Sequence, residues 1–505
     1  MSDTTSRQCT VSGGSASTEA QFTDMRSAAA RLGATGGQTG YLRRQVLGIA
    51  ACLPEKSAIL SPGSAVDIAQ QVAGLTLNLT ALGLHMEFTA STLRWSATVY
   101  ELTDTAQRAL LAAVNVATAP ARLSGDLAVD AVVAAAEHPW SASTLSWDKG
   151  PWAGAVTSHL QQQLINDPAL VDGLVPWTGA GVWVAGSAAA ALGDVYGQAP
   201  DALQHAASWF SPSAAVGDFA ATHHLLAPPP AQDFEGQIAW LLAVGRSLGY
   251  FDDTRPLAVT QTREQHRRTR KRQLSDVTAA AADVEHRSGA DGSVLLVRRV
   301  VGADGTGAWV VAIPGTSHWP LRSDHGPSNT AANLATMAGA SSSLYPAVDK
   351  ALTAAMKESG VQPGTEPVLV TGHSQGGIVA ARLAVDDGFR TKFDVREVVT
   401  DGSPIDRIPI PDDVHVLSIE NNHDIVPELD GTAVPDSMHR VDVRCEAPPG
   451  EHLHTVIDAH DASRYTRSAG ELTIDSDDQL AQWYSRNSRF LDGSETDYEF
   501  DLRRP

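Results

Sequence analysis

Residues 372–376 read Gly-His-Ser-Gln-Gly, a Gly-x-Ser-x-Gly pentapeptide, and they are the strongest chemical signal in the sequence. An apolar run at Val368–Val370 leads into the pentapeptide, and a helix-forming run at Ile378–Ala384 follows it. A strand–turn–helix of this kind places its serine on a tight elbow with the hydroxyl clear of the backbone, and the glycines leave room for neighbouring chain. The pattern therefore predicts that Ser374 is a nucleophile.

A serine hydroxyl needs a base to activate it, and the base needs an orienting carboxylate. The order along the chain for an elbow of this type is serine, acid, histidine, so both partners are expected beyond residue 374. Asp424 is the predicted acid because it lies just past a strand predicted at Val414–Ile419. Asp401 also follows a predicted strand, but one strand earlier. It is the runner-up, and a turn or helix-cap role is favoured for it.

The general base must be one of the histidines after the acid, which are His439, His452, His454 and His460. His439 begins a predicted strand, which indicates a structural role. His460 follows a long loop and opens a helix-like stretch, so it is the preferred base. His454 is kept as the alternative base.

The oxyanion of the reaction needs hydrogen-bond donors, which usually come from the residue after the nucleophile and from the loop after an early strand. The first of these is Gln375. An apolar strand predicted at Trp309–Ile313 runs into Pro-Gly-Thr at residues 314–316 and supplies the second. Gly315 lets the backbone approach closely, and Thr316 offers both an N–H and a hydroxyl. We therefore expect Thr316 and Gln375 to form the oxyanion hole.

Taken together, these segments resemble the α/β-hydrolase superfamily, and within it the class 3 lipase-like branch of serine esterases. The residues that carry the resemblance are Ile313-Pro314-Gly315-Thr316, the pentapeptide at 372–376, Asp424-Ile425-Val426-Pro427 and His460. The resemblance covers about residues 290–490. It implies Ser374, Asp424 and His460 as a catalytic triad, with Thr316 and Gln375 as oxyanion donors.

The elements that would position these residues alternate between strand and helix from residue 293 onward. Strands are predicted at Val294–Val300, Trp309–Ile313, Val368–Val370, Val395–Thr400 and Val414–Ile419, and helices at 329–337, 344–358 and 376–387. This alternation predicts an α/β fold whose parallel-rich sheet is covered on both faces. The active groups should lie at the carboxyl ends of its strands.

Changes in composition divide the chain into five zones. They are 1–40, expected to be disordered; 41–260, a mainly α-helical domain; 261–289, a basic helical linker; 290–490, the α/β-hydrolase domain; and 491–505, an acidic tail. The basic run at 263–272 fits a lipid-headgroup patch, but a solvated helical linker is the favoured interpretation.

The helical domain carries a second resemblance, at residues 93–104. Tyr100 and Asp104 are similar to the Tyr-x-x-x-Asp feature of helical hairpin modules in actinobacterial type VII secretion substrates. Ordinary helix packing gives the same spacing and is the favoured explanation. The helices would then form a lid, a partner surface or an anchoring module.

Charge and cysteine content limit the partners and the compartment. The 505 residues carry a formal net charge of −21, which argues against nucleic acid as a partner. The cysteines, Cys9, Cys52 and Cys445, are odd in number and far apart, so neither a disulfide framework nor a metal site is predicted, and a reducing compartment fits. Neither a signal peptide nor a transmembrane segment is expected. Cytoplasmic localisation is therefore the default, and export without a classical signal peptide is the alternative.

The sequence thus predicts a serine carboxylic-ester hydrolase of the esterase or lipase type, with a role in lipid metabolism. Its substrate would be a small-molecule ester or lipid, cleaved through an acyl-enzyme without a metal or organic cofactor. An acyltransferase or thioesterase would use the same chemistry. The alternative function is an exported protein that binds a protein partner through its helical module, with a subordinate or inactive hydrolase domain.

Overall fold

The computed structural model describes residues 9–51, 68, 70–98, 161–172, 234–247, 253, 255–289, 292–317, 326–448 and 451–504. The chain forms two compact units. The first combines Met1–Gly13, Ala112–Pro435 and His439–Pro505, and the second combines Gly14–Leu111 and Asp436–Met438. Every predicted site residue belongs to the first unit.

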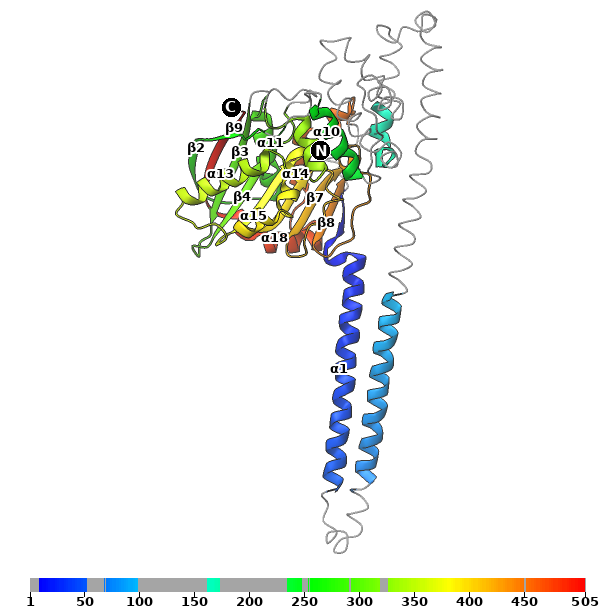
Figure 1. Ribbon diagram of the computed structural model, residues 1–505. Coiled ribbons are helices and arrows are strands. Elements are labelled where there is room, and N and C mark those ends of the chain that lie inside the picture. The colour runs from blue at the N-terminus through cyan, green and yellow to red at the C-terminus, as the bar shows by residue number, and fades with distance from the viewer. Residues whose placement is uncertain are drawn as a thin grey trace, which may run out of the picture. The chain divides into compact units, whose positions relative to one another are not determined.

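A nine-stranded mixed sheet forms the centre of the first unit, in the order β1-β8-β7-β6-β5-β4-β3-β9-β2 (Figure 1). The strands are β1 (Cys9–Gly13), β2 (Ala258–Lys271), β3 (Ser293–Val301), β4 (Gly307–Ile313), β5 (Pro367–His373), β6 (Asp394–Asp401), β7 (His415–Asn421), β8 (Arg440–Cys445) and β9 (Asp492–Arg503). Strands β4 to β8 run parallel, while β1, β3, β9 and β2 pair antiparallel with their neighbours. The predicted α/β fold with a parallel-rich sheet is confirmed.

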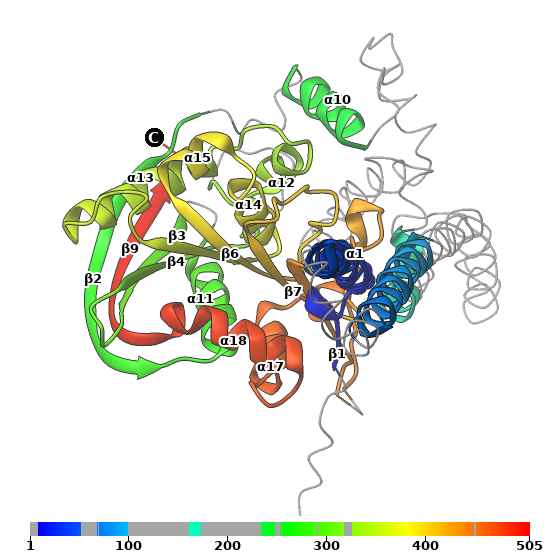
Figure 2. The ribbon, with the colours of Figure 1, turned by 90° about the horizontal axis from the view of Figure 1, so that it is seen from below.

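Helices pack on both faces of this sheet. Helices α12 (Thr330–Met337), α13 (Leu344–Glu358), α14 (Gln375–Leu383) and α15 (Asp387–Lys392) lie on one face, and α11 (Leu274–Arg287), α17 (Ala462–Glu471) and α18 (Asp478–Leu491) lie on the other (Figure 2). The remaining described helices of this unit include α10 (Phe234–Ser247), α16 (Val456–Ala459) and the 3₁₀ turn η2 (Pro427–Asp430). Because both faces are covered, successive residues of β5 enter opposite cores: Val368 and Val370 join one, and Leu369 the other.

The structure contains each of the five strands predicted from residue 293 onward, and of the three helices predicted there, one differs. The helix predicted over 376–387 is two helices, α14 and α15. The side chain of Asp386 accepts a hydrogen bond from the N–H of Phe389 and so caps a new helix start.

Two zone assignments at the edge of the sheet were wrong in part, since residues 274–287 of the expected helical linker do form a helix, α11. The basic run lies in strand β2, not in a helical linker, and the acidic tail is strand β9, which pairs with both β2 and β3. The two strands carry opposite charges, and Arg263 pairs with Glu499 at 3.7 Å across them. Cross-strand pairs of this kind stabilise a sheet. Basic residues on an outer strand also oppose pairing with another chain.

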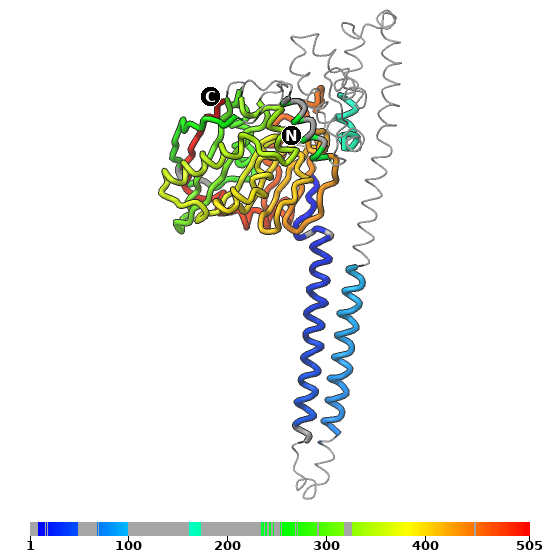
Figure 3. Tube along the Cα trace, in the orientation of Figure 1, coloured from blue at the N-terminus to red at the C-terminus, as the bar shows by residue number. Residues whose placement is uncertain are grey.

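The second unit is a helical hairpin. Helix α1 (Thr18–Ala51) and a helix over residues 70–98 lie side by side and antiparallel (Figure 3). The two helices approach closely at Gly83, where a Cβ would lie 2.5 Å from Oγ1 of Thr39. Tyr100 and Asp104, which carry the second resemblance, lie outside the described residues. In the described parts of the chain, no helix has the length and apolarity needed to cross a membrane.

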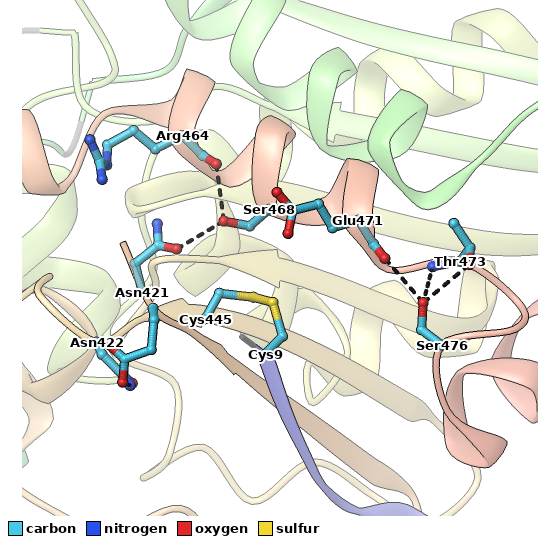
Figure 4. Close-up of a disulfide and its surroundings, with 10 residues drawn as sticks. Cys9, Asn421, Asn422, Cys445, Arg464, Ser468, Glu471, Thr473 and Ser476 are labelled. Carbon is cyan, nitrogen blue, oxygen red and sulfur yellow. Dashed lines mark hydrogen bonds between the residues drawn. A yellow bond between two sulfur atoms is a disulfide. The ribbon is translucent and has the colours of Figure 1, made fainter. Parts of the chain in front are cut away.

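The expectation of disorder over residues 1–40 was wrong for residues 9–40, and residues 1–8 lie outside the described residues. Residues 9–13 form β1, which pairs antiparallel with β8, and a disulfide joins Cys9 to Cys445 at the end of these two strands (Figure 4). A sequence separation of 436 conceals this pairing in the sequence. The carbonyl oxygen of Cys445 also accepts a hydrogen bond from the N–H of Asn422 at 3.0 Å, so β8 is tied to the loop after β7.

We expect reduction of this disulfide to lower the free energy of unfolding by about 2–4 kcal/mol, because the bond fixes the outermost strand of the sheet to its neighbour. Thermal unfolding with and without reductant measures the effect. A Cys52→Ser variant is the control and should respond to reductant as the wild type does, whereas Cys9→Ser should not respond. A Cys9→Ser variant that still loses stability on reduction would contradict the assignment.

Candidate active site

Ser374 stands between β5 and α14 in a backbone conformation that few residues adopt. Its φ is 53° and its ψ −120°, and it is the one non-glycine residue with positive φ among those described. Its N–H donates to the carbonyl of Asp401 at 2.9 Å, and its own carbonyl accepts from Oγ of Ser403 at 2.9 Å. Strain of this kind persists only where surrounding contacts hold it. The geometry is that of a nucleophile elbow.

A buried pair of side chains, Asp424 and His460, lies near this elbow. Asp424 is in the loop after β7, and His460 ends the short helix α16. Nδ1 of His460 lies 2.6 Å from Oδ2 of Asp424. Because a carboxylate only accepts, Nδ1 carries a proton, and in the neutral imidazole the lone pair is then on Nε2. Nε2 is buried without a hydrogen-bond partner among the described residues, so it is free to accept a proton.

The charge of Asp424 is stabilised by its neighbours. Burial works to raise the pKa of Asp424, but the charge of His460 and hydrogen bonds from His460, Tyr465 and the Val426 N–H hold that pKa below its ordinary value. The carboxylate therefore stays ionised in the neutral range. An ionised carboxylate fixes the imidazole tautomer and stabilises the imidazolium that forms when His460 takes up a proton.

The hydroxyl of Tyr465, on α17, is a donor to Asp424 that sequence reasoning missed. It lies 2.5 Å from Oδ2 of Asp424. Burial, followed by the charge of Asp424, raises the pKa of Tyr465 well above its ordinary value, so the hydroxyl remains a donor. Its position on a helix that follows His460 carries no sequence signal, because many tyrosines on such helices serve only packing.

The two predicted oxyanion segments lie in contact. A Cβ on Gly376 would overlap the carbonyl oxygen of Ile313, so the turn after β4 is packed directly against the elbow. Thr316 is buried in this turn, and the amide of Asn333 donates to its Oγ1 at 2.9 Å. Gln375 opens α14, where the first N–H groups have no partner within the helix. The side-chain amide of Gln375 donates to the carbonyl of Asn329 at 2.9 Å.

The two alternative residues take no part in the His460–Asp424 pair. His454 is exposed, and its N–H donates to Asp458 at 3.3 Å. Asp401 ends β6 beside His373 in the parallel register, and neither oxygen of its carboxyl has a hydrogen-bond partner among the described residues. Burial raises the pKa of Asp401 to about 8, although the charge of His373 works against this. The structure therefore pairs His460 with Asp424, and no hydrogen bond among the described residues joins His454 to Asp424 or Asp401 to His460.

Over the described ranges, no group of three or more His, Cys, Asp or Glu side chains is arranged to hold a metal ion. What the site offers is a hydroxyl on a strained turn, an imidazole with an available lone pair, a buried carboxylate and a helix N-terminus. Such a set can carry out acyl transfer through a covalent intermediate.

Comparison with known proteins gives one match. A family model described as a PGAP1-like alpha/beta domain matches residues 323–460, a segment that includes Ser374, Asp424 and His460. No curated protein sequence and no solved structure matches the chain. The sheet topology and this match support an α/β-hydrolase superfamily member with a hydrolase-type domain.

Proposed function

We propose that this protein is a serine hydrolase that cleaves carboxylic esters through an acyl-enzyme. The observation that carries the proposal is the combination of Ser374 in the elbow conformation with the 2.6 Å His460–Asp424 pair. A hydroxyl held in a strained turn can act as a nucleophile, and an imidazole oriented by a carboxylate can act as its general base.

In the proposed reaction, Nε2 of His460 accepts the Ser374 proton as the serine oxygen attacks the ester carbonyl. The N–H groups of Gln375 and Thr316 donate to the oxyanion that forms. The tetrahedral intermediate collapses, the carbonyl–alkoxy bond breaks, and His460 gives its proton to the departing alcohol. Water then gives a proton to His460 and attacks the acyl carbonyl. The bond between the acyl group and the serine oxygen breaks, His460 returns its proton to that oxygen, and the acid is released with Ser374 restored. These reaction steps require no metal or organic cofactor.

The substrate class that we propose is a lipid or other acyl ester. The support is the sequence resemblance to class 3 lipase-like esterases. Transfer of the acyl group to an acceptor other than water, or hydrolysis of a thioester, would use the same residues. These variants differ only in the acceptor or the leaving group.

The test combines covalent labelling with a substrate series. A fluorophosphonate probe should label the wild-type protein, and peptide mapping should place the label on Ser374. Hydrolysis of p-nitrophenyl esters from acetyl to palmitoyl then gives the acyl preference. If no ester is cleaved and no serine is labelled in the folded protein, the proposed function is wrong.

The alternative function is that of an exported partner-binding protein, and two observations favour it. Large apolar side chains stand exposed on the helical hairpin, with Leu77 at 70%, Phe88 at 72% and Trp95 at 69% exposure. Exposed apolar surface often marks an interaction site. The Cys9–Cys445 disulfide supports an oxidising compartment, since such bonds are rare in the cytosol. We therefore favour export over the cytoplasmic localisation expected from cysteine content.

A further inference from the structure

Glu285, on helix α11, contacts the two segments that form the candidate active site. Its Oε2 lies 2.7 Å from Nδ1 of His373, the residue before Ser374. A Cβ on Gly315 would overlap the same carboxylate, so the turn after β4 is packed against Glu285 as well. Glu285 lies outside the matched segment 323–460, and neither motif nor spacing points to it. The carboxylate of Glu285 thus contacts both the residue before Ser374 and the turn at Gly315.

His373 lies between Glu285 and the candidate base, His460, and contacts both. Its ring is buried and lies against the ring of His460, with centroids 4.5 Å apart and an angle of 34° between the planes. The ring of Tyr465 lies 5.3 Å from it. The imidazole of His460 is therefore bounded on one side by His373 and held at Nδ1 by Asp424. A shift of His373 would remove one of the two restraints on the base.

We propose that Glu285 is a positioning residue for the reaction: it holds His373 against the His460 imidazole and holds the Gly315 turn beside the elbow. The proposal rests on the proposed function, because it assigns Glu285 a role in that same site. Positioning matters in such sites, since small displacements of reacting groups cost large factors in rate. The hydrogen bond from a charged imidazole to a carboxylate is of the stronger kind.

The protonation state of His373 makes this role measurable. The charged or titratable groups that act on or lie against its ring are Glu285 on α11, Asp401 on β6, Asp424, His460, and Asp461 and Tyr465 at α17. Burial works to lower the pKa of His373, but the charge and hydrogen bond of Glu285, followed by the charges of Asp401 and Asp424, raise it to about 9. His373 is therefore a cation below pH 9 and becomes neutral above it. The charge-assisted bond to Glu285 is lost over that range.

The experiment compares Glu285→Gln with the wild type. The matched control is Asp283→Asn, since Asp283 lies on the same helix with its side chain 60% exposed and paired only with Arg287 among the ion pairs described. Values of kcat and KM on a p-nitrophenyl ester and the rate of fluorophosphonate labelling of Ser374 are measured across pH. We expect kcat of Glu285→Gln to fall about tenfold while KM stays within about twofold, because the lost contact acts on the reacting groups. Asp283→Asn should behave as the wild type.

The pH profile distinguishes positioning from general stabilisation. In the wild type, kcat should decline above about pH 9, where His373 loses its proton. In Glu285→Gln this decline should begin at lower pH, because the carboxylate that raises the pKa of His373 is gone. A second variant, His373→Gln, should have a low kcat without that decline, and adding Glu285→Gln to it should change kcat little.

Each outcome decides the matter. A folded Glu285→Gln protein with wild-type kcat and pH profile overturns the inference, and so does an equal loss at every pH accompanied by a lower melting temperature. In both cases the wild type still labels at Ser374, so the proposed function stands. If the folded wild type is not labelled at Ser374, the proposed function fails and the inference fails with it.

Discussion

The variant Ser374→Ala should abolish ester hydrolysis and fluorophosphonate labelling while the fold stays intact. The hydroxyl oxygen is the atom that forms the covalent bond, so no other group can replace it. Loss of the nucleophile in a serine triad reduces turnover by up to ~10⁶. Stability should change little, because the backbone hydrogen bonds at Ser374, to Asp401 and from Ser403, do not involve the side chain that is removed.

Turnover of a p-nitrophenyl ester and circular dichroism on the same samples provide the measurement. Ser488→Ala is a suitable control, because Ser488 is exposed on α18 and its hydroxyl bonds only within that helix. Activity of Ser374→Ala within a few-fold of the wild type would show that another group is the nucleophile. A folded, exported wild type that is never labelled at Ser374 would instead favour the partner-binding function.

The serine elbow could be predicted because everything that determines it is contiguous. The strand, the pentapeptide and the helix after Ser374 follow one another without a gap, and the structure has β5, the positive φ and α14 in that order. The same holds for the turn after Trp309–Ile313. Parallel strands end at one edge of the sheet, so two local patterns are enough to bring the turn and the elbow into contact.

The choice between Asp424 and Asp401 needed more than local pattern. Both follow predicted strands and both satisfy the chain order, and Asp424 was preferred because Asp401 lies one strand earlier. The structure gives a physical reason for the difference. Asp401 lies beside His373 with its carboxyl unpartnered among the described residues, whereas Asp424 receives hydrogen bonds from His460, Tyr465 and the N–H of Val426.

Long-range pairings could not be predicted. The Cys9–Cys445 disulfide and the β2–β9 pair each join residues that are far apart in the sequence. The local spacing of apolar and polar residues contains no information about such distant partners. The basic run at 263–272 illustrates the difficulty. Taken alone, its charges are compatible with a solvated helix, and the acidic strand β9 that pairs with it is more than 200 residues further along the chain. The role of Glu285 could not be predicted for the same reason, because it lies 88 positions before His373 in the chain.

His460→Ala should lower turnover nearly as far as Ser374→Ala, whereas His454→Ala should leave turnover close to the wild-type value. A general base must lie within hydrogen-bond reach of the proton that it takes. His460 has a buried Nε2 with no partner among the described residues and an Nδ1 held 2.6 Å from Asp424. His454 is exposed before helix α16, and its recorded bonds use its backbone. In triads of this kind, loss of the histidine costs about as much as loss of the serine, up to ~10⁶.

The two histidine variants serve as controls for each other, because both sit on the segment that leads into and ends α16. Turnover on one p-nitrophenyl ester, together with the rate of fluorophosphonate labelling, separates the base from a bystander: a serine without its base should label far more slowly. Equal and mild losses in both variants would contradict a triad that contains either residue. A severe loss in His454→Ala alone would mean that the loop before α16 moves during the reaction and that His454 takes the proton from Ser374.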